Sequence, residues 1–273
     1  MKKNVKILIL VLIVASFAFQ GGCPPQVGPT VNPIVLAHGF GGWNAFVAFE
    51  YFYKVKDYLQ SAGFEVYASD VSPVNSIAAR AQDLKEDILS RYPNRKVNII
   101  AHSMGGLDAR YMITHLDMAD QVASVTTIAT PHRGTSVADV AVGILPGSTE
   151  AITDFFLNIV GLDWDGVTEL TMDYVRSEFN PSTPDHPDVS YFSYGGNSLP
   201  VLSPLLVVPA ATILVLEGMN DGLVSVISAQ WGSYLGTLNA DHIDEIGQIA
   251  GITDFDFLGF YLDHAKFLKA HGF

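Results

Sequence analysis

A serine between an apolar run and an amphipathic segment has the surroundings of a nucleophile. Ser103 follows residues 97–101, expected to be a buried strand, and precedes residues 105–116, expected to be a helix. A serine at such a turn adopts a strained backbone, so the residues two places before and after it must be small. Ala101 and Gly105 meet this requirement. The turn would present the Ser103 hydroxyl above the sheet, at a helix N-terminus that favours developing negative charge.

A serine hydroxyl becomes an effective nucleophile only when a histidine accepts its proton and a carboxylate orients that histidine. On folds with this turn, the chain order is serine, acid, histidine. Asp221 follows residues 211–217, which are expected to form a strand, and His242 follows in a polar loop. We therefore predict that Ser103, Asp221 and His242 are the catalytic residues.

Other side chains compete for the roles of acid and base. Glu217 is the alternative acid, although it would lie inside the predicted strand. His264 lies on the expected last helix, where packing or solvation accounts for it, and His271 lies at the frayed end of that helix. His38 and His102 precede both acids, so the order argument leaves them to orient the backbone.

A glycine-rich turn follows the first expected strand and suits the stabilisation of an oxyanion. Residues 38–42 read His-Gly-Phe-Gly-Gly, and glycines let backbone N–H groups approach a substrate oxygen closely. We predict that the N–H groups of Phe40 and Met104 bind the oxyanion. The alternative for these glycines is an ordinary tight turn.

Strands and helices alternate along the chain from residue 34 onward. Strands are expected at residues 34–37, 65–71, 97–101, 122–129, 189–194 and 211–217, and helices at residues 46–59, 75–92, 105–116 and 255–270. Repeated alternation predicts an α/β fold, with a mainly parallel sheet flanked by helices. Ligands of such folds bind beyond the carboxyl ends of the strands, so the site is expected there.

Composition narrows the classes of function. The chain has 273 residues, of which 49% are hydrophobic and 16% charged, so a sizeable core is expected. Its 15 Lys and Arg against 28 Asp and Glu give a net charge of -13, which argues against nucleic-acid binding and against anionic membranes. A single cysteine excludes an internal disulfide and a cysteine-rich zinc site.

The first residues are expected to direct export rather than to join the fold. Residues 1–22 combine lysines with an apolar run too short to span a bilayer of about 30 Å, as in a secretory signal peptide. Cys23 resembles the lipidated cysteine of a bacterial lipoprotein, although Gln20 departs from that signal. Cleavage after Ala18 and an uncleaved membrane anchor are the alternatives. The protein would be extracellular, periplasmic or anchored by lipid at the cell envelope.

Several segments resemble, in the same order, the true lipases of bacteria, the family of the Pseudomonas, Burkholderia and Proteus triacylglycerol lipases. The segments are residues 38–42, 102–107, 123–128, 130–134, 220–224 and 242–245. The resemblance covers residues 33–273 and implies one α/β-hydrolase catalytic domain with a helical lid at about residues 137–185. It implies a secreted triacylglycerol lipase, expected to be a monomer, that cleaves lipid or ester substrates at an oil–water interface with the triad predicted above.

The resemblance also assigns the long segment after residue 129 to a lid. An apolar stripe would form the underside of this lid and consists of Ile152, Phe155, Phe156, Ile159 and Val160. Such a lid would open at an oil–water interface and close in water. The alternative is a fixed core helix, and Trp164 and Phe179 fit either interpretation.

No cofactor is required for the predicted chemistry, but members of the family often hold a structural calcium ion. Asp244, Gln248 and the Ile252 carbonyl match one side of that site by resemblance. The other side should supply a carboxylate, and residues 199–204 contain none. Losing one hard oxygen ligand should weaken calcium binding strongly. The alternative role of Asp244 is to form hydrogen bonds within its loop.

Three other functions stay open. A soluble short-chain esterase and a thioesterase or acyltransferase would use the same triad. A catalytically silent binding module on the same fold belongs to a different class. The presence of serine, acid, histidine and the glycine turn together argues against the silent module.

Overall fold

The computed structural model describes residues 23–40, 50–145, 164–198, 206–248 and 254–273. The predicted signal peptide, the apolar stripe of the predicted lid, the Ile252 carbonyl and residues 199–204 lie outside this part of the chain. Within the described residues, no helix is both long enough and apolar enough to cross a membrane.

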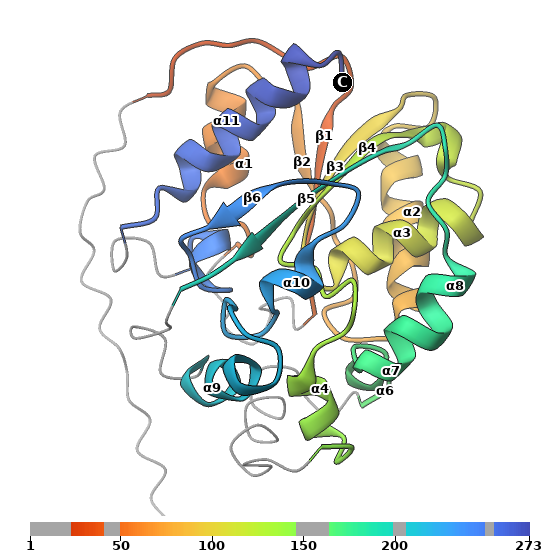
Figure 1. The fold of residues 1–273 in the computed structure, drawn as a ribbon. Helices are drawn as coiled ribbons and strands as arrows, with labels where there is room; N and C mark the ends of the chain where they lie inside the picture. The colour runs from red at the N-terminus through yellow and green to blue at the C-terminus, as the bar shows by residue number, and fades with distance from the viewer. Residues whose placement is uncertain (1–22, 41–49, 146–163, 199–205, 249–253) are drawn as a thin grey trace, which may run out of the picture.

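Six parallel strands form the central sheet, in the order β2-β1-β3-β4-β5-β6 (Figure 1). The strands are β1 (Ile34–Ala37), β2 (Val66–Ala68), β3 (Val97–His102), β4 (Val122–Ile128), β5 (Ser190–Gly196) and β6 (Ser233–Leu238). The predicted α/β class is confirmed.

Helices cover both faces of this sheet. On one face lie α1 (Val55–Ser61) and α11 (Phe257–Ala270), and on the other lie α2 (Ile77–Arg91) and α3 (Gly105–His115). Because helices cover both faces, β1 and β3 are buried along their whole length, which explains why they are apolar runs without alternation.

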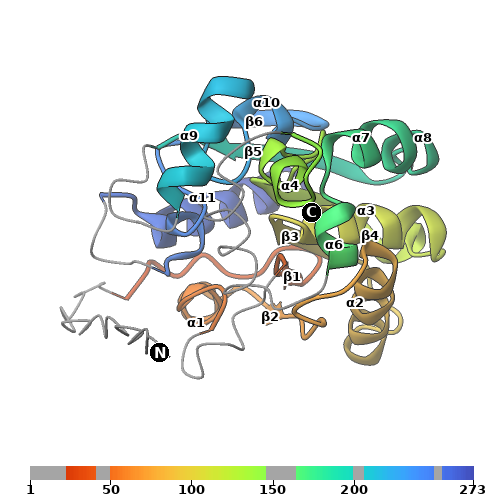
Figure 2. The same ribbon diagram turned by 90° about the horizontal axis from the view of Figure 1, so that it is seen from below.

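The shorter described helices are α4 (Ser136–Ala141), α6 (Trp164–Thr168), α7 (Met172–Tyr174), the π-helix Val175–Phe179, α8 (Asn180–Ser182), α9 (Val207–Leu216) and α10 (Val226–Ala229). Of these, α4, α6, α7 and α9 lie beyond the carboxyl ends of the strands, in the lower part of Figure 1, and α4 faces the viewer in Figure 2. Two single 3-10 turns, Ala119–Gln121 and Asp244–Ile246, complete the described elements. This is the end of the sheet at which the sequence predicts the site.

Two predicted elements differ from the structure. The predicted strand at residues 211–217 is wrong, because these residues belong mainly to α9. A short apolar run does not distinguish a buried strand from a helix, and here the β-branched residues misled the assignment. The sixth strand is β6, a mostly half-exposed strand at the edge of the sheet. The helix expected at residues 46–59 begins only at Val55 within the described chain.

His264 on α11 is buried and should make the protein sensitive to acid. Its ring nitrogens lie 2.7 Å from Thr126 Oγ1 and 3.2 Å from Tyr194 Oη. Burial lowers the pKa of His264 from 6.5 to about 3. The folded protein therefore binds fewer protons than the unfolded chain between these values, so the free energy of unfolding falls as the pH falls through this window.

We expect the buried His264 to lower the free energy of unfolding by about 2 kcal/mol at pH 5 relative to neutral pH. Urea unfolding of His264→Gln at pH 7 and pH 5 should show a smaller loss on acidification than the parent. His271→Gln, on the exposed histidine at the end of α11, should keep the parent's loss. An equal acid loss in His264→Gln and the parent would contradict this assignment.

Candidate active site

Ser103 lies where β3 passes into α3, as the sequence predicts. Its φ angle of 56° places a non-glycine residue in the left-handed region, which is the strain that this turn requires. The Ser103 N–H donates to the Ile128 carbonyl at 2.9 Å, and the Thr130 hydroxyl donates to the Ser103 carbonyl at 2.7 Å. A Cβ atom at Gly105 would lie 2.7 Å from the His38 carbonyl oxygen. The small residue at this position is therefore required for the helix to start so close to β1.

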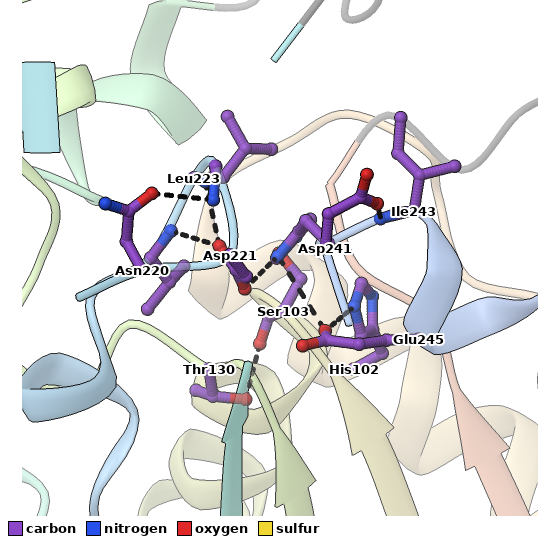
Figure 3. A network of polar contacts seen from close by, with 12 residues as sticks. His102, Ser103, Thr130, Asn220, Asp221, Leu223, Asp241, Ile243 and Glu245 are labelled. Atoms are coloured by element: carbon purple, nitrogen blue, oxygen red, sulfur yellow. Dashed lines mark hydrogen bonds and ion pairs between the residues drawn. The ribbon is translucent and has the colours of Figure 1, made fainter. Parts of the chain in front are cut away.

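The three residues predicted as a triad meet at the carboxyl edge of the sheet. The Ser103 hydroxyl lies 3.0 Å from His242 Nε2, and His242 Nδ1 lies 2.8 Å from Asp221 Oδ2. Asp221 is fully buried and His242 is 7% exposed, whereas Ser103 is partly exposed. Figure 3 shows Ser103 and Asp221 within the polar network of the site. This geometry allows His242 to accept the serine proton while Asp221 holds the ring.

A tight loop fixes the orientation of the Asp221 carboxylate. Its Oδ1 atom accepts the backbone N–H groups of Leu223 and Val224 at 2.8 and 2.7 Å. The side chain of Asn220 accepts the Gly222 N–H at 2.9 Å and closes the turn (Figure 3). With Oδ1 held by two amides, Oδ2 is the atom that points at His242. The loop follows α9 and not a strand, but it presents the acid as predicted.

The predicted oxyanion donors lie on the two segments beside Ser103. Met104 is the N-cap residue of α3, where a backbone N–H has no partner inside the helix. Phe40 follows β1 and its side chain packs in the same apolar cluster as Met104. A buried guanidinium, that of Arg80, donates to the His38 carbonyl at 2.8 Å and pairs with Asp108 at 2.8 Å. This ion pair holds the end of β1 next to the site.

Sequence reasoning missed a buried polar network behind His242. The Tyr51 hydroxyl lies 2.7 Å from His102 Nδ1, and His102 Nε2 lies 3.0 Å from Glu245 Oε2. Burial lowers the pKa of His102 well below its usual value. Burial, followed by the charge of Asp221, raises the pKa of Glu245 well above its usual value. Both shifts favour an uncharged pair in which Glu245 and His102 share one proton.

The uncharged pair of Glu245 and His102 lies next to His242, the candidate base. Glu245 Oε2 lies 4.0 Å from His242 Nδ1, and the rings of His102 and His242 are 4.4 Å apart. A neutral Glu245 leaves Asp221 as the anion that orients His242. The available signal for Glu245 was its place in the segment 242–245, which carries the resemblance to bacterial lipases.

The competing acid has a structural partner instead of a histidine. Glu217 accepts the Ser136 N–H at 2.8 Å and the Ser225 hydroxyl at 2.7 Å. These bonds tie the C-terminal end of α9 to α4 and to the start of α10. Asp221, not Glu217, is the carboxylate that contacts His242.

The other candidate histidines have different partners or positions in the structure. The ring nitrogens of His38 lie 2.9 Å from the Gly39 carbonyl and 3.0 Å from the Val71 carbonyl, so His38 orients backbone as predicted. His264 on α11 is buried against β4 and β5, and His271 is exposed at the end of that helix.

The described residues include two side chains of the predicted calcium site, Asp244 and Gln248. Gln248 Nε2 donates to the carbonyls of Glu50 and Tyr51 at 2.6 and 2.7 Å, which directs this amide group at the segment before α1. Asp244 is buried in the adjoining 3-10 turn. Calcium takes six to eight oxygen ligands, and the other positions considered for this site lie outside the described chain, so the calcium site stays a prediction.

Part of the predicted lid packs firmly beside the site. Trp164 and Phe179, at the two ends of the segment α6 to the π-helix, contact the apolar cluster that contains Met104 and Leu107. The assignment of residues 137–185 as a lid stays a prediction, because residues 146–163 lie outside the described chain.

Known proteins share this fold and much of this sequence. The family model for the alpha/beta hydrolase fold matches residues 32–168. Triacylglycerol lipase 2 of Saccharomyces cerevisiae is 34% identical over 316 residues, which cover 92% of this chain and 95% of the relative. The triacylglycerol lipase of Vibrio cholerae is 29% identical over 89% of each chain. The solved structure of a mature Bacillus licheniformis lipase superposes with a TM-score of 0.66 at 25% identity, covering 84% of this chain and 92% of that one.

The similarity extends across both the serine turn and the acid and histidine loops. The predicted resemblance to bacterial lipases is confirmed by relatives named triacylglycerol lipase from several bacteria. The chain belongs to the lipase family of the α/β-hydrolase superfamily and is a serine hydrolase of carboxylic esters.

Proposed function

We propose that the protein is a triacylglycerol lipase that works by two acyl transfers through Ser103, His242 and Asp221. The observation that carries this proposal is the continuous line of hydrogen bonds from the Ser103 hydroxyl through the His242 ring to the buried Asp221 carboxylate. Relatives named triacylglycerol lipase support this substrate class.

In the first step, Ser103 Oγ attacks the ester carbonyl carbon while His242 Nε2 takes the hydroxyl proton. Asp221 stabilises the imidazolium that forms. The N–H groups of Phe40 and Met104 bind the oxyanion, and losing one such donor commonly costs about 3–4 kcal/mol. His242 then gives its proton to the leaving alkoxide, which departs as the alcohol and leaves an acyl group on Ser103.

In the second step, water enters where the alcohol left. His242 removes a proton from this water, the resulting oxygen attacks the acyl carbon, and the bond to Ser103 Oγ breaks. The proton on His242 returns to Ser103 Oγ, and the fatty acid leaves. The same three side chains thus serve both halves of the reaction.

The proposal includes export and a lid. Cys23 is an exposed free thiol at the start of the described chain, where a lipid anchor could be attached after removal of residues 1–22. Residues 137–185 would form the lid over the site, and the protein would act as a monomer at an oil–water interface.

An ester series together with active-serine labelling tests the substrate class. The purified protein should hydrolyse emulsified long-chain triacylglycerols, with a rate that rises as the substrate passes its solubility limit, and a fluorophosphonate probe should label Ser103. The same hydrolysis assay with a calcium chelator added measures separately whether calcium affects the rate. Activity confined to dissolved short esters would replace the lipase proposal with an esterase, and transfer to an alcohol or amine acceptor in preference to water would indicate an acyltransferase. Absence of labelling would favour a silent module.

A further inference from the structure

Helix α9 is apolar on its outer face as well as on its inner face. Leu206, Ala210 and Ile213 are buried toward α4 and the core. The opposite face exposes Val207, Ala211, Leu214 and Val215, which we call the α9 surface. Val215 is 84% exposed and Leu214 53%. A helix on the surface of a soluble domain normally carries polar residues on its outer face, so this helix is unusual.

The sequence around this helix is also free of charge. Residues 189–216 contain no Asp, Glu, Lys, Arg or His, in a chain that otherwise carries 28 acidic residues. A partner that recognised this segment by charge would find nothing to pair with. Contiguous apolar surface without charge is typical of sites that contact another apolar phase.

The α9 surface adjoins the catalytic loop. Figures 1 and 2 place α9 with α4 beyond the carboxyl ends of the strands. The Asn220 side chain donates to the Ala210 carbonyl at 3.2 Å, which ties the helix to the residue before Asp221. Glu217 anchors the other end of α9 through Ser136 and Ser225. Met219, two residues before Asp221, is 61% exposed. The apolar surface therefore runs to the rim of the site and is held in place there.

We propose that the α9 surface is the docking face by which the enzyme settles on a neutral lipid phase; this rests on the proposed lipase function. A lipid surface needs no charge complementarity, which fits the uncharged segment and the net charge of -13. Contact through a face continuous with the Asp221 loop would hold the mouth of the site against the phase that contains the ester. The exposed apolar side chains would then enter the lipid instead of water.

A binding assay that needs no chemistry tests this docking face. The full chain carrying Ser103→Ala is mixed with triolein droplets coated with phosphatidylcholine, and the bound fraction is measured by flotation. Adding Val215→Glu should weaken binding at least about tenfold, because a charge would have to enter the lipid. Glutamate is a good helix former, so α9 should persist. The matched control is Val31→Glu, at a 70% exposed valine just before β1, and it should bind as the parent does.

Three further measurements separate the outcomes. In the chain with Ser103 intact, Val215→Glu should hydrolyse a dissolved short ester at the parent rate and keep the parent's thermal midpoint. Equal droplet binding by Val215→Glu and the parent would overturn the proposal, and so would an equal loss in Val31→Glu. A parent that sediments as a dimer and a Val215→Glu variant that sediments as a monomer would assign the face to a second copy of the chain instead. Failure to cleave any ester would refute the proposed function, whereas droplet binding would still be measured.

Discussion

Replacing Ser103 with alanine should lower kcat for ester hydrolysis by at least about 10⁴-fold, the scale seen when a triad nucleophile is removed. Ser103 Oγ lies 3.0 Å from His242 Nε2 and is the atom that would accept the acyl group. Alanine has no oxygen at this position, so the acyl-enzyme cannot form. Substrate binding should change little, because a methyl group replaces a small hydroxyl. Initial rates are measured on one short and one long ester, and the active-site concentration is measured in the parent. These values give the ratio of kcat between Ser103→Ala and the parent.

The control for this substitution is Ser90→Ala on α2, at an exposed serine whose hydroxyl donates only to the Asp87 carbonyl one turn earlier. It should retain the parent rate. Far-ultraviolet circular dichroism and thermal midpoint should be the same in all three proteins. Residual activity above about 1% in Ser103→Ala, not traceable to parent contamination, would place the nucleophile elsewhere.

The catalytic geometry could be predicted from sequence because it depends on local chemistry and chain order. The turn at Ser103 needs small residues at fixed positions, and that requirement is visible in the sequence. The order serine, acid, histidine then excludes His38 and His102. The placement of Asp221 and His242 in loops favours them over the other candidates that satisfy this order. Buried parallel strands such as β1 and β3 are likewise visible, because burial on both faces demands continuous apolar residues.

The elements that were missed depend on tertiary contacts. Residues 207–216 form a helix because α4 and the core cover its inner face, and apolar runs of this length carry no period that separates helix from strand. β6 is an edge strand with exposed positions, so its apolar signal is weak. The network from Tyr51 through His102 to Glu245 joins residues from three distant parts of the chain. Rules based on local spacing in the sequence therefore could not predict these contacts.

Asp221→Asn should lower kcat by about 10³ to 10⁴-fold with almost no change in structure. Oδ1 of Asp221 accepts two backbone N–H groups, so the amide oxygen of the asparagine must occupy that position. Its NH₂ group then faces His242 Nδ1, at the place now held by Oδ2. An NH₂ donor forces His242 to carry its proton on Nε2, and this tautomer cannot accept the proton of Ser103.

The size of the loss in Asp221→Asn also reports on Glu245, which lies 4.0 Å from His242 Nδ1. If Glu245 stays uncharged in the variant, as burial favours, the further substitution Glu245→Gln should change the rate of Asp221→Asn by less than about threefold. In the parent background, Glu245→Gln preserves the size of the side chain and serves as the matched control. A kcat of Asp221→Asn within tenfold of the parent, at every pH between 6 and 9, would show that Asp221 does not set the tautomer of His242.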